Sequence, residues 1–203
     1  TTATAASVNG SSHSYATGGT YTISIEVDNG NIQDTIQTFT VTVNPAPSVT
    51  LSGINVLCPN DTIVISGTAD VAHQWYLNGA QVPAQTSATI TVSAPGVYNM
   101  ITTNSFGCSD SSQTPFILTA VPNPTVALGT DYSACVSTTL DAGNAGSTYL
   151  WSTNATTQTE TVTASGTYNV LVTDTNGCSA SDTIAVVINP LPVVTLGADT
   201  TNC

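Results

Sequence analysis

Apolar and polar residues alternate along many short stretches of the chain, a period of two that is typical of β-strands with one buried face. The stretch "TYNVLVTD", for example, places Tyr168, Val170 and Val172 on one face and Asn169 and Thr173 on the other. The Asn176-Gly177 pair that follows is a strong hairpin signal. Helical periodicity is absent from the sequence, and the pattern therefore predicts an all-β protein.

Two parts of the chain repeat one plan of short strands. In the later part the predicted strands are 125–129, 136–143, 147–152, 157–164, 167–174 and 182–189, and in the middle part they are 62–67, 73–79, 87–92 and 97–103. Such strands, with a Trp on the third and a Tyr near the start of the penultimate one, describe an immunoglobulin-like sandwich. We therefore expect four aromatic residues to lie in the cores: Trp75, Tyr98, Trp151 and Tyr168.

Other landmarks recur at nearly the same interval. Tyr21, Tyr98 and Tyr168 lie 77 and then 70 residues apart, and a Pro-x-Pro signal occurs at 45–47 and again at 122–124 and 190–192. A unit of about seventy residues is the size of a small domain and too long for a solenoid repeat.

These landmarks divide the chain into four parts. Residues 45–121 and 122–189 are predicted to be complete immunoglobulin-like domains, residues 1–44 the second half of another, and residues 190–203 the first strand of a following one. The proline junctions stiffen the joins, which predicts tandem sandwiches in a rod-like array. Donor-strand exchange, in which one molecule's tail completes the next molecule's head, is the alternative.

Cysteine spacing adds a prediction about cross-links. Each complete domain has two cysteines around its Trp and Tyr, which predicts the disulfides Cys58–Cys108 and Cys135–Cys178, with Cys203 left unpaired in this sequence. Disulfides are favoured over metal ligation, because no Cys-x-x-Cys spacing or histidine cluster occurs. Ten residues separate the Tyr from the second Cys, so the bridge is expected at one end of each sandwich. Disulfides imply an oxidising compartment.

The composition excludes several functions. The chain has no Lys or Arg, 12 acidic residues and a net charge of −12, so binding to nucleic acid or insertion into an anionic membrane is not expected. Chemistry that needs a lysine or an arginine is excluded as well. The bias towards uncharged polar residues suits life outside the cell, although a habit of the genome explains it equally well.

No catalytic or metal-binding motif stands out. His73 is expected to pack near Trp75, His13 lies in a Ser-rich turn, and the sequence lacks a Gly-x-Ser-x-Gly elbow, so we predict no enzyme activity and no cofactor. Asp131 and Asp199 recur four residues before a Cys and are weak candidates for Ca²⁺ ligands, with a turn-capping role as the alternative.

The repeats resemble a known group of secreted proteins. The stretches "GTYNVLVTDTNGCSASDTIAVVINPLP" and "LWSTNATTQTETVTASGTY" are similar to tandem Ig-like repeats of very large surface proteins of Bacteroidota, including gliding-motility adhesins of the SprB type and other cargo of type IX secretion. The segment "HSYATGGTYTISIEVDNGNIQDTIQTFTVTVNPAP" is similar to a PKD domain, so residues 1–44 resemble the C-terminal part of one. The resemblance implies an extracellular, cell-surface protein.

The same resemblance implies sites of O-glycosylation. In that group, sugars are added at Asp-Thr or Asp-Ser followed by an apolar residue. The candidates here are Thr35, Thr62 and Thr183, with Thr200 as a looser match. The alternative is that Asp-Thr simply begins a strand, since Asp suits a turn and Thr suits a sheet.

The sequence as a whole favours a non-catalytic structural repeat of an extracellular adhesin or surface filament, with neighbouring repeats as its partners. A glycan- or protein-binding module is the main alternative, in which exposed aromatic residues such as Tyr76, Phe106 or Tyr132 recognise the partner. An appendage of a secreted hydrolase is the third.

Overall fold

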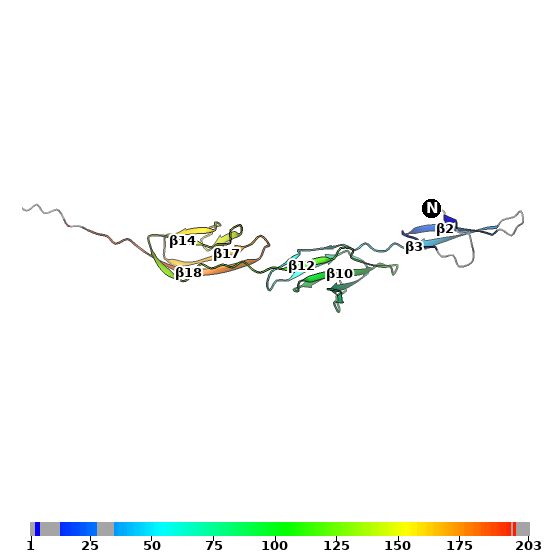
Figure 1. Cartoon of the computed structure of the whole chain (residues 1–203), viewed down its shortest axis with the longest axis horizontal. Coiled ribbons are helices and arrows are strands. Elements are labelled where there is room, and N and C mark those ends of the chain that lie inside the picture. Colours follow the sequence, from blue (N-terminus) through cyan, green and yellow to red (C-terminus); the bar gives the residue numbers. More distant parts are fainter. Residues whose placement is uncertain (1–2, 5–12, 28–34, 196, 198–203) are drawn as a thin grey trace, which may run out of the picture. The chain divides into compact units, whose positions relative to one another are not determined.

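The described residues of the chain are all-β. The structure is a computed structural model that describes residues 3–4, 13–27, 35–195 and 197. Every regular element in these residues is a strand, and Figure 1 shows arrows joined by loops with no coiled ribbon among them. The chain divides into two compact units, Thr1–Asn55 with Thr62–Thr119, and Val56–Asp61 with Ala120–Cys203. The short segment 56–61 therefore belongs to the second unit, although its sequence flanks belong to the first.

The first unit begins with a small sheet of order β1-β2-β3. Its strands are β1 (Ala3–Thr4), β2 (Gly19–Val27) and β3 (Thr35–Val43). β2 and β3 form a long antiparallel hairpin, and β1 pairs with β2 in parallel. The hydroxyl of Tyr21 donates to the carbonyl of Thr17 at 2.7 Å.

Two sheets follow in the middle of the chain. One has the order β4-β6-β9, with β4 (Leu51–Ser52), β6 (Ile63–Gly67) and β9 (Thr89–Val92). The other has the order β5-β12-β10-β7-β8, and β11 pairs with β10. Its strands are β5 (Val56–Leu57), β7 (Ala72–Leu77), β8 (Ala80–Gln81), β10 (Gly96–Thr103), β11 (Ser109–Ser111) and β12 (Phe116–Ala120).

The second unit repeats this plan. One sheet has the order β13-β18-β17-β15 and the other consists of β14 and β16. The strands are β13 (Tyr132–Cys135), β14 (Thr138–Asp141), β15 (Thr148–Trp151), β16 (Thr159–Val162), β17 (Gly166–Thr173) and β18 (Ser179–Asn189). In both cases the Trp strand pairs with the last hairpin, and a short first strand, β5 or β13, joins the edge of the same sheet. The opposite sheet is β4-β6-β9 in one case and β14-β16 in the other. This division is that of an immunoglobulin-like β-sandwich.

The two sandwiches also have similar cores. Trp75 and Trp151 are buried, and each indole N–H donates to a backbone carbonyl at 2.8 Å, that of Ser87 and that of Thr157. Tyr98 is buried as well, whereas Tyr168 is half-buried. The alternation predicted for the Tyr168 strand is present in β17, where Val170 and Val172 are buried and Leu171 between them is exposed.

The tyrosines near the start of the penultimate strands are anchored in the same way. Tyr98 donates its hydroxyl to the carbonyl of Ala94 and Tyr168 to that of Ala164, both at 2.7 Å. A tyrosine that bonds back to the backbone a few residues upstream is a feature of immunoglobulin-like sandwiches. Burial also raises the pKa of Tyr98.

The prediction of a first strand at 125–129 is wrong. This stretch is irregular, although Val126 and Leu128 pack against the core. The amide of Leu128 donates to the Asp182 carboxylate at 2.8 Å, a bond to a side chain in place of the backbone ladder that a strand would form.

An unpredicted strand lies just after it. β13 runs parallel to β18, so that Tyr132 is opposite Val186 and Cys135 is opposite Asn189. The strand predicted over 136–143 is correspondingly shorter and begins at Thr138 as β14. This parallel pairing decides where the cysteines lie.

Candidate functional site

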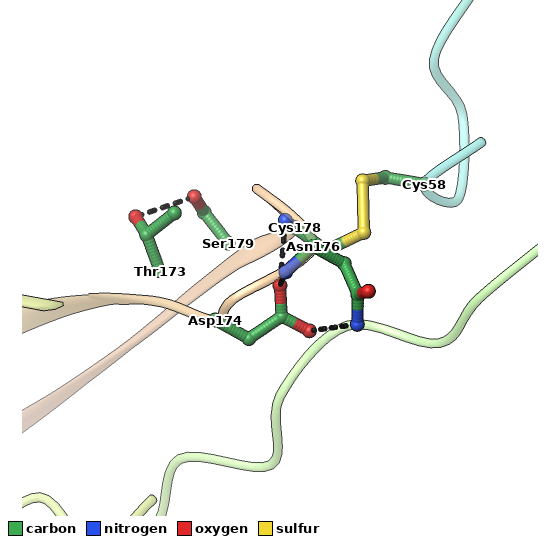
Figure 2. Close-up of a disulfide and its surroundings, with 6 residues drawn as sticks. All are labelled: Cys58, Thr173, Asp174, Asn176, Cys178 and Ser179. Atoms are coloured by element: carbon green, nitrogen blue, oxygen red, sulfur yellow. Dashed lines mark hydrogen bonds between the residues drawn. A yellow bond between two sulfur atoms is a disulfide. The ribbon is translucent and has the colours of Figure 1, made fainter. Parts of the chain in front are cut away.

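A single disulfide is present in the described part of the chain, between Cys58 and Cys178. Their Cα atoms lie 5.4 Å apart and the two residues are 120 positions apart in the sequence (Figure 2). The predicted pairs Cys58–Cys108 and Cys135–Cys178 are therefore wrong, and Cys108 and Cys135 are free thiols. The bond joins a cysteine of one sequence repeat, 45–121, to a cysteine of the next, 122–189.

The parallel pairing explains why the predicted bond within residues 122–189 does not form. Cys178 directly precedes β18, whereas Cys135 lies opposite Asn189 at the other end of that strand. Eleven residues of strand at about 3.3 Å each separate the two ends by about 36 Å. A disulfide requires Cα atoms less than about 7 Å apart. An antiparallel first strand would have placed the two cysteines together.

Residues 56–61 carry the other half of the bond. The amide of Val121 donates to the carbonyl of Leu57 at 3.1 Å, so that Cys58 lies beside the residue that follows β12. The side chain of Leu57 is only 5% exposed. The amide of Asp61 donates back to the carbonyl of Cys58 at 3.2 Å and forms a turn around the cysteine. We call residues 56–61 and 132–136 the first-strand segments.

Cys178 is held by the turn 174–178. One carboxylate oxygen of Asp174 accepts the amides of Asn176 and Cys178, at 2.8 and 2.9 Å (Figure 2). Gly177 occupies the left-handed region, with φ of 88°, where a residue with a side chain would be strained. The hydroxyls of Thr173 and Ser179 bond across the base of the turn at 2.8 Å. These contacts fix the direction of the Cys178 side chain, which is fully buried.

The turn 104–108 has the same geometry around a free cysteine. The side-chain oxygen of Asn104 accepts the amides of Phe106 and Cys108, at 3.0 and 3.1 Å. Gly107 has φ of 81°, and the pair Thr103–Ser109 repeats the hydroxyl bond at 2.8 Å. We call 104–108 and 174–178 the cysteine turns. They present equivalent sulfur atoms, one bonded and one free.

The free thiol of Cys108 lies against the proline junction that precedes its repeat. Its sulfur is 3.9 Å from the carbonyl oxygen of Asn44, and the side-chain amide of Asn104 donates to the carbonyl of Pro45 at 2.9 Å. The other cysteine turn lies at the corresponding junction, since Asp174 and Thr175 line a hollow of about 310 Å³ together with residues 122–124 and 144–147.

Sequence reasoning missed Asn104 and Asp174, which position the two cysteines. A signal was present: each cysteine turn has Asn or Asp four residues before its Cys and a Gly directly before it. Short polar side chains that accept a backbone amide two residues on are typical turn formers.

The remaining candidate residues have structural surroundings. His73 contacts the amide of Asp70 at 3.1 Å and the carbonyl of Thr68 at 3.2 Å, and His13 is exposed beside Tyr15. The Asp131 carboxylate accepts the amide of Ala185 at 2.9 Å, which ties the residue just before the first-strand segment 132–136 to β18. No group of three or more His, Cys, Asp or Glu side chains that could hold a metal ion occurs among the described residues. Asp199 and Cys203 lie outside them.

Two of the candidate glycosylation sites are accessible. Thr62 and Thr183 are exposed, and the hydroxyl of Thr183 accepts a hydrogen bond from the Asn169 side chain at 3.0 Å. The side chain of Thr35 and the whole of Thr200 lie outside the described residues.

The aromatic residues considered for partner binding lie on different elements. Tyr76 is half-buried on β7 opposite Asn99, whereas Phe106 is exposed in the turn beyond the end of β10. Tyr132, at the start of β13, bonds to the hydroxyl of Thr138 at 2.7 Å. None of the three lines the hollow beside the second cysteine turn.

Comparison with known proteins gives likeness in structure only. No protein-family model matches the sequence, and no curated protein sequence matches it. A Ca²⁺-stabilised adhesin of an Antarctic bacterium that binds ice has 14% identity and a TM-score of 0.40 over 84% of this chain and 57% of that one. A 1.5-MDa bacterial ice-binding adhesin has 15% identity and a TM-score of 0.38 over 82% of this chain and 74% of that one.

The insect immune protein hemolin is also similar, with 15% identity and a TM-score of 0.37 over 83% of this chain and 56% of hemolin. The chain thus spans less than two thirds of the Antarctic adhesin and of hemolin. As to membranes, the described residues hold no helix long and apolar enough to span one.

Proposed function

We propose that the chain is a stretch of non-catalytic structural repeats from an extracellular adhesin or surface filament, which spans distance and bears load. The observation that carries this proposal is the bond between Cys58 and Cys178. Because it joins one sequence repeat to the next, it adds a second covalent connection to the peptide linkage.

The disulfide and the composition both support an extracellular location. Disulfides persist in oxidising compartments and are rare in the cytosol. The absence of Lys and Arg leaves no cleavage point for trypsin-like proteases. The resemblance of the repeats to Bacteroidota surface proteins supports a finer proposal, that the parent protein is cargo of type IX secretion used in surface adhesion or gliding.

A binding module remains the alternative, and the arrangement of aromatic residues does not favour it. Recognition of a glycan usually relies on aromatic side chains gathered beside a concave surface with a few polar groups. Tyr76 lies on β7, whereas Phe106 lies in the turn between β10 and β11. Screening the whole chain on a glycan array tests this alternative directly, and selective binding to one glycan class would contradict a purely structural role.

Pulling single molecules by their termini tests the load-bearing role. In the oxidised protein the bond passes the force from Cys58 to Cys178, so the chain between them, a separation of 120 positions, stays out of the extended length. Reduction should add about 420 Å to the maximum extension, at about 3.5 Å per residue. The Cys58→Ser variant should show the longer extension without reductant.

Equal extensions of the oxidised and reduced protein would contradict the proposal, because the force would then bypass no part of either sandwich. The Cys135→Ser variant is the matched control, since it removes an exposed free thiol and leaves the bond in place. Its extension should equal that of the unmodified protein in both states.

A further inference from the structure

The edge of β3 corresponds to the edge that carries a first-strand segment in the second unit. In the second unit such a segment, β13, lies parallel along the edge of the closing strand β18. β3 is the closing strand of residues 1–44, because it forms the last hairpin with the strand that carries Tyr21. Among the described residues β3 pairs with β2 alone, and its other edge carries no strand. An exposed edge of this kind can accept an added strand.

The free thiol of Cys108 lies at the end of this edge. Its sulfur contacts the carbonyl of Asn44, the residue that follows the last position of β3. The partner of Cys178 lies at the equivalent place. Cys58 follows Leu57, whose carbonyl accepts the amide of Val121, and Val121 is the residue directly after the closing strand β12. A first-strand segment added to β3 in the same register would therefore bring its cysteine to Cys108.

From these two observations we propose that Cys108 forms a disulfide with the cysteine of a first-strand segment that lies parallel along β3. The segment is of the type of residues 56–61, and its source is the repeat whose second half is residues 1–44. The bond repeats Cys58–Cys178 one repeat earlier. Two thiols lose two protons and two electrons to a disulfide oxidant, either a thiol oxidoreductase in its disulfide form or a small-molecule disulfide, which is reduced to two thiols.

Cys135 is placed to form the corresponding bond with the repeat that follows residues 122–189. It is exposed and free, and it sits on β13 opposite Asn189, directly before the junction 190–192. It therefore occupies the place that Cys58 occupies before the junction 122–124. The cysteine turn of a following repeat is its partner under the same rule, so that each repeat is bonded to the next and the bonds form a ladder along the array.

Thiol–disulfide exchange with a synthetic peptide tests the proposal. The peptide has the sequence of residues 54–62, "INVLCPNDT", and the protein carries Cys203→Ser and Cys135→Ser so that Cys108 is its single free cysteine. Cys108 is first converted to its mixed disulfide with glutathione. The peptide thiolate attacks the Cys108 sulfur, the new disulfide forms, and glutathione leaves as its thiol. The equilibrium constant is measured by mass spectrometry.

The matched control is the same peptide with Leu57→Gly. It keeps the thiol and the charge but lacks the leucine side chain, which is buried where the segment 56–61 carries the existing Cys58–Cys178 bond. We expect an equilibrium constant at least about tenfold higher for the native peptide than for the control, because burial of a leucine side chain favours the docked state. Protection of β3 amides from hydrogen exchange should accompany the native adduct alone.

Equal equilibrium constants for the two peptides would overturn the proposal, as would covalent dimers joined through two copies of Cys108, which would assign the thiol to self-association. The proposal rests on the function proposed above, and the two tests can fail separately. The pulling experiment depends on Cys58 and Cys178 only, whereas the exchange experiment depends on Cys108 only.

Discussion

At the scale of single residues, the cysteine turns show that local hydrogen bonds determine where each sulfur points. Asn104 and Asp174 differ in charge, yet each accepts two backbone amides through one side-chain oxygen. The requirement is therefore an oxygen on a short side chain and not a negative charge. Because the whole geometry lies within five residues, it is independent of whether the cysteine is bonded.

Asp182 is a residue whose negative charge does contribute to the stability of the fold. Hydrogen bonds from the amides of Leu128 and then Thr183 hold the pKa of Asp182 below its ordinary value. A carboxyl group with a lower pKa in the folded state stabilises the fold above its unfolded pKa, and that contribution is lost as the pH falls through the folded pKa. The bond to Leu128 joins the irregular first stretch to β18.

The variant Asp182→Asn should accordingly be less stable than the original protein at neutral pH, and the difference should shrink as the pH falls below about 4, the ordinary aspartate pKa. Urea unfolding at a series of pH values measures it. Asp61→Asn, which removes the same charge from an exposed position, is the control. A difference for Asp182→Asn that stays constant from neutral to acid pH would show that the charge plays no part.

At the scale of elements, the direction of one short strand determines the cross-links. β13 runs parallel to β18, so its cysteine lies at the end of the closing strand, next to the junction that follows. The cysteine turn lies at the beginning of that strand, next to the junction that precedes. The two cysteines of one repeat are thus kept apart, and each lies beside a junction.

Loss of the bond should lower stability by a large amount. In the chain-entropy model, a bond that closes a loop of 120 positions contributes about 5 kcal/mol to the free energy of unfolding. Cys58→Ser should lose up to this amount in urea unfolding of the oxidised protein. Replacement of Cys58 is preferable to that of Cys178, because Cys178 is fully buried and serine there would also bury a hydroxyl.

Cys135→Ser is the control for this experiment and should change the free energy of unfolding by less than about 0.5 kcal/mol, since an exposed residue without a bond is replaced. Under reducing conditions all three proteins should unfold at the same urea concentration. If the Cys58→Ser variant unfolded at the same urea concentration as the oxidised original protein, the entropic contribution of the bond would be contradicted.

Much of the fold follows from the sequence, because the strands with strict alternation bury one face and are specified locally. The strands of Trp75, Trp151, Tyr98 and Tyr168 are present close to their predicted bounds. The stretch 125–129 also alternates but is irregular, because its inward residues pack while the Leu128 amide bonds to a side chain. Burial alone, therefore, does not make a strand.

The cysteine pairing could not be obtained from spacing. β13 has four residues and no alternating apolar pattern, so nothing local indicates that it is a strand or that it runs parallel to a partner fifty-four residues later. Parallel pairing is a long-range property of the sheet. The turn signals of Asn104 and Asp174 were visible in the sequence, but they locate a sulfur atom without naming its partner.

At the scale of the whole molecule, the bond changes what a break in the chain does. Every peptide bond between Cys58 and Cys178 lies inside a covalent loop. A single cut there leaves both products joined through sulfur. In the proposed ladder, the loops of successive bonds overlap, so that no single cut at a junction would release the outer part of the array. This property suits a surface protein exposed to proteases and shear.

Limited digestion with chymotrypsin tests the consequence in the chain itself. Phe106 is 63% exposed in a cysteine turn within the loop, and Phe39 is 45% exposed outside it. A cut after Phe106 should leave one band on a denaturing gel without reductant and two bands with it. A cut after Phe39 should release the N-terminal fragment in both cases and thus serves as an internal control.

The Cys58→Ser variant should differ from the original protein only in the products of cleavage after Phe106. Without the bond, the products of cleavage after Phe106 should separate on a denaturing gel even without reductant, whereas the fragments from cleavage after Phe39 should be unchanged. If the nicked original protein also separated without reductant, residues on the two sides of the cut would share no covalent link. The array would then depend on its peptide junctions alone, and a load-bearing role would lose its main support.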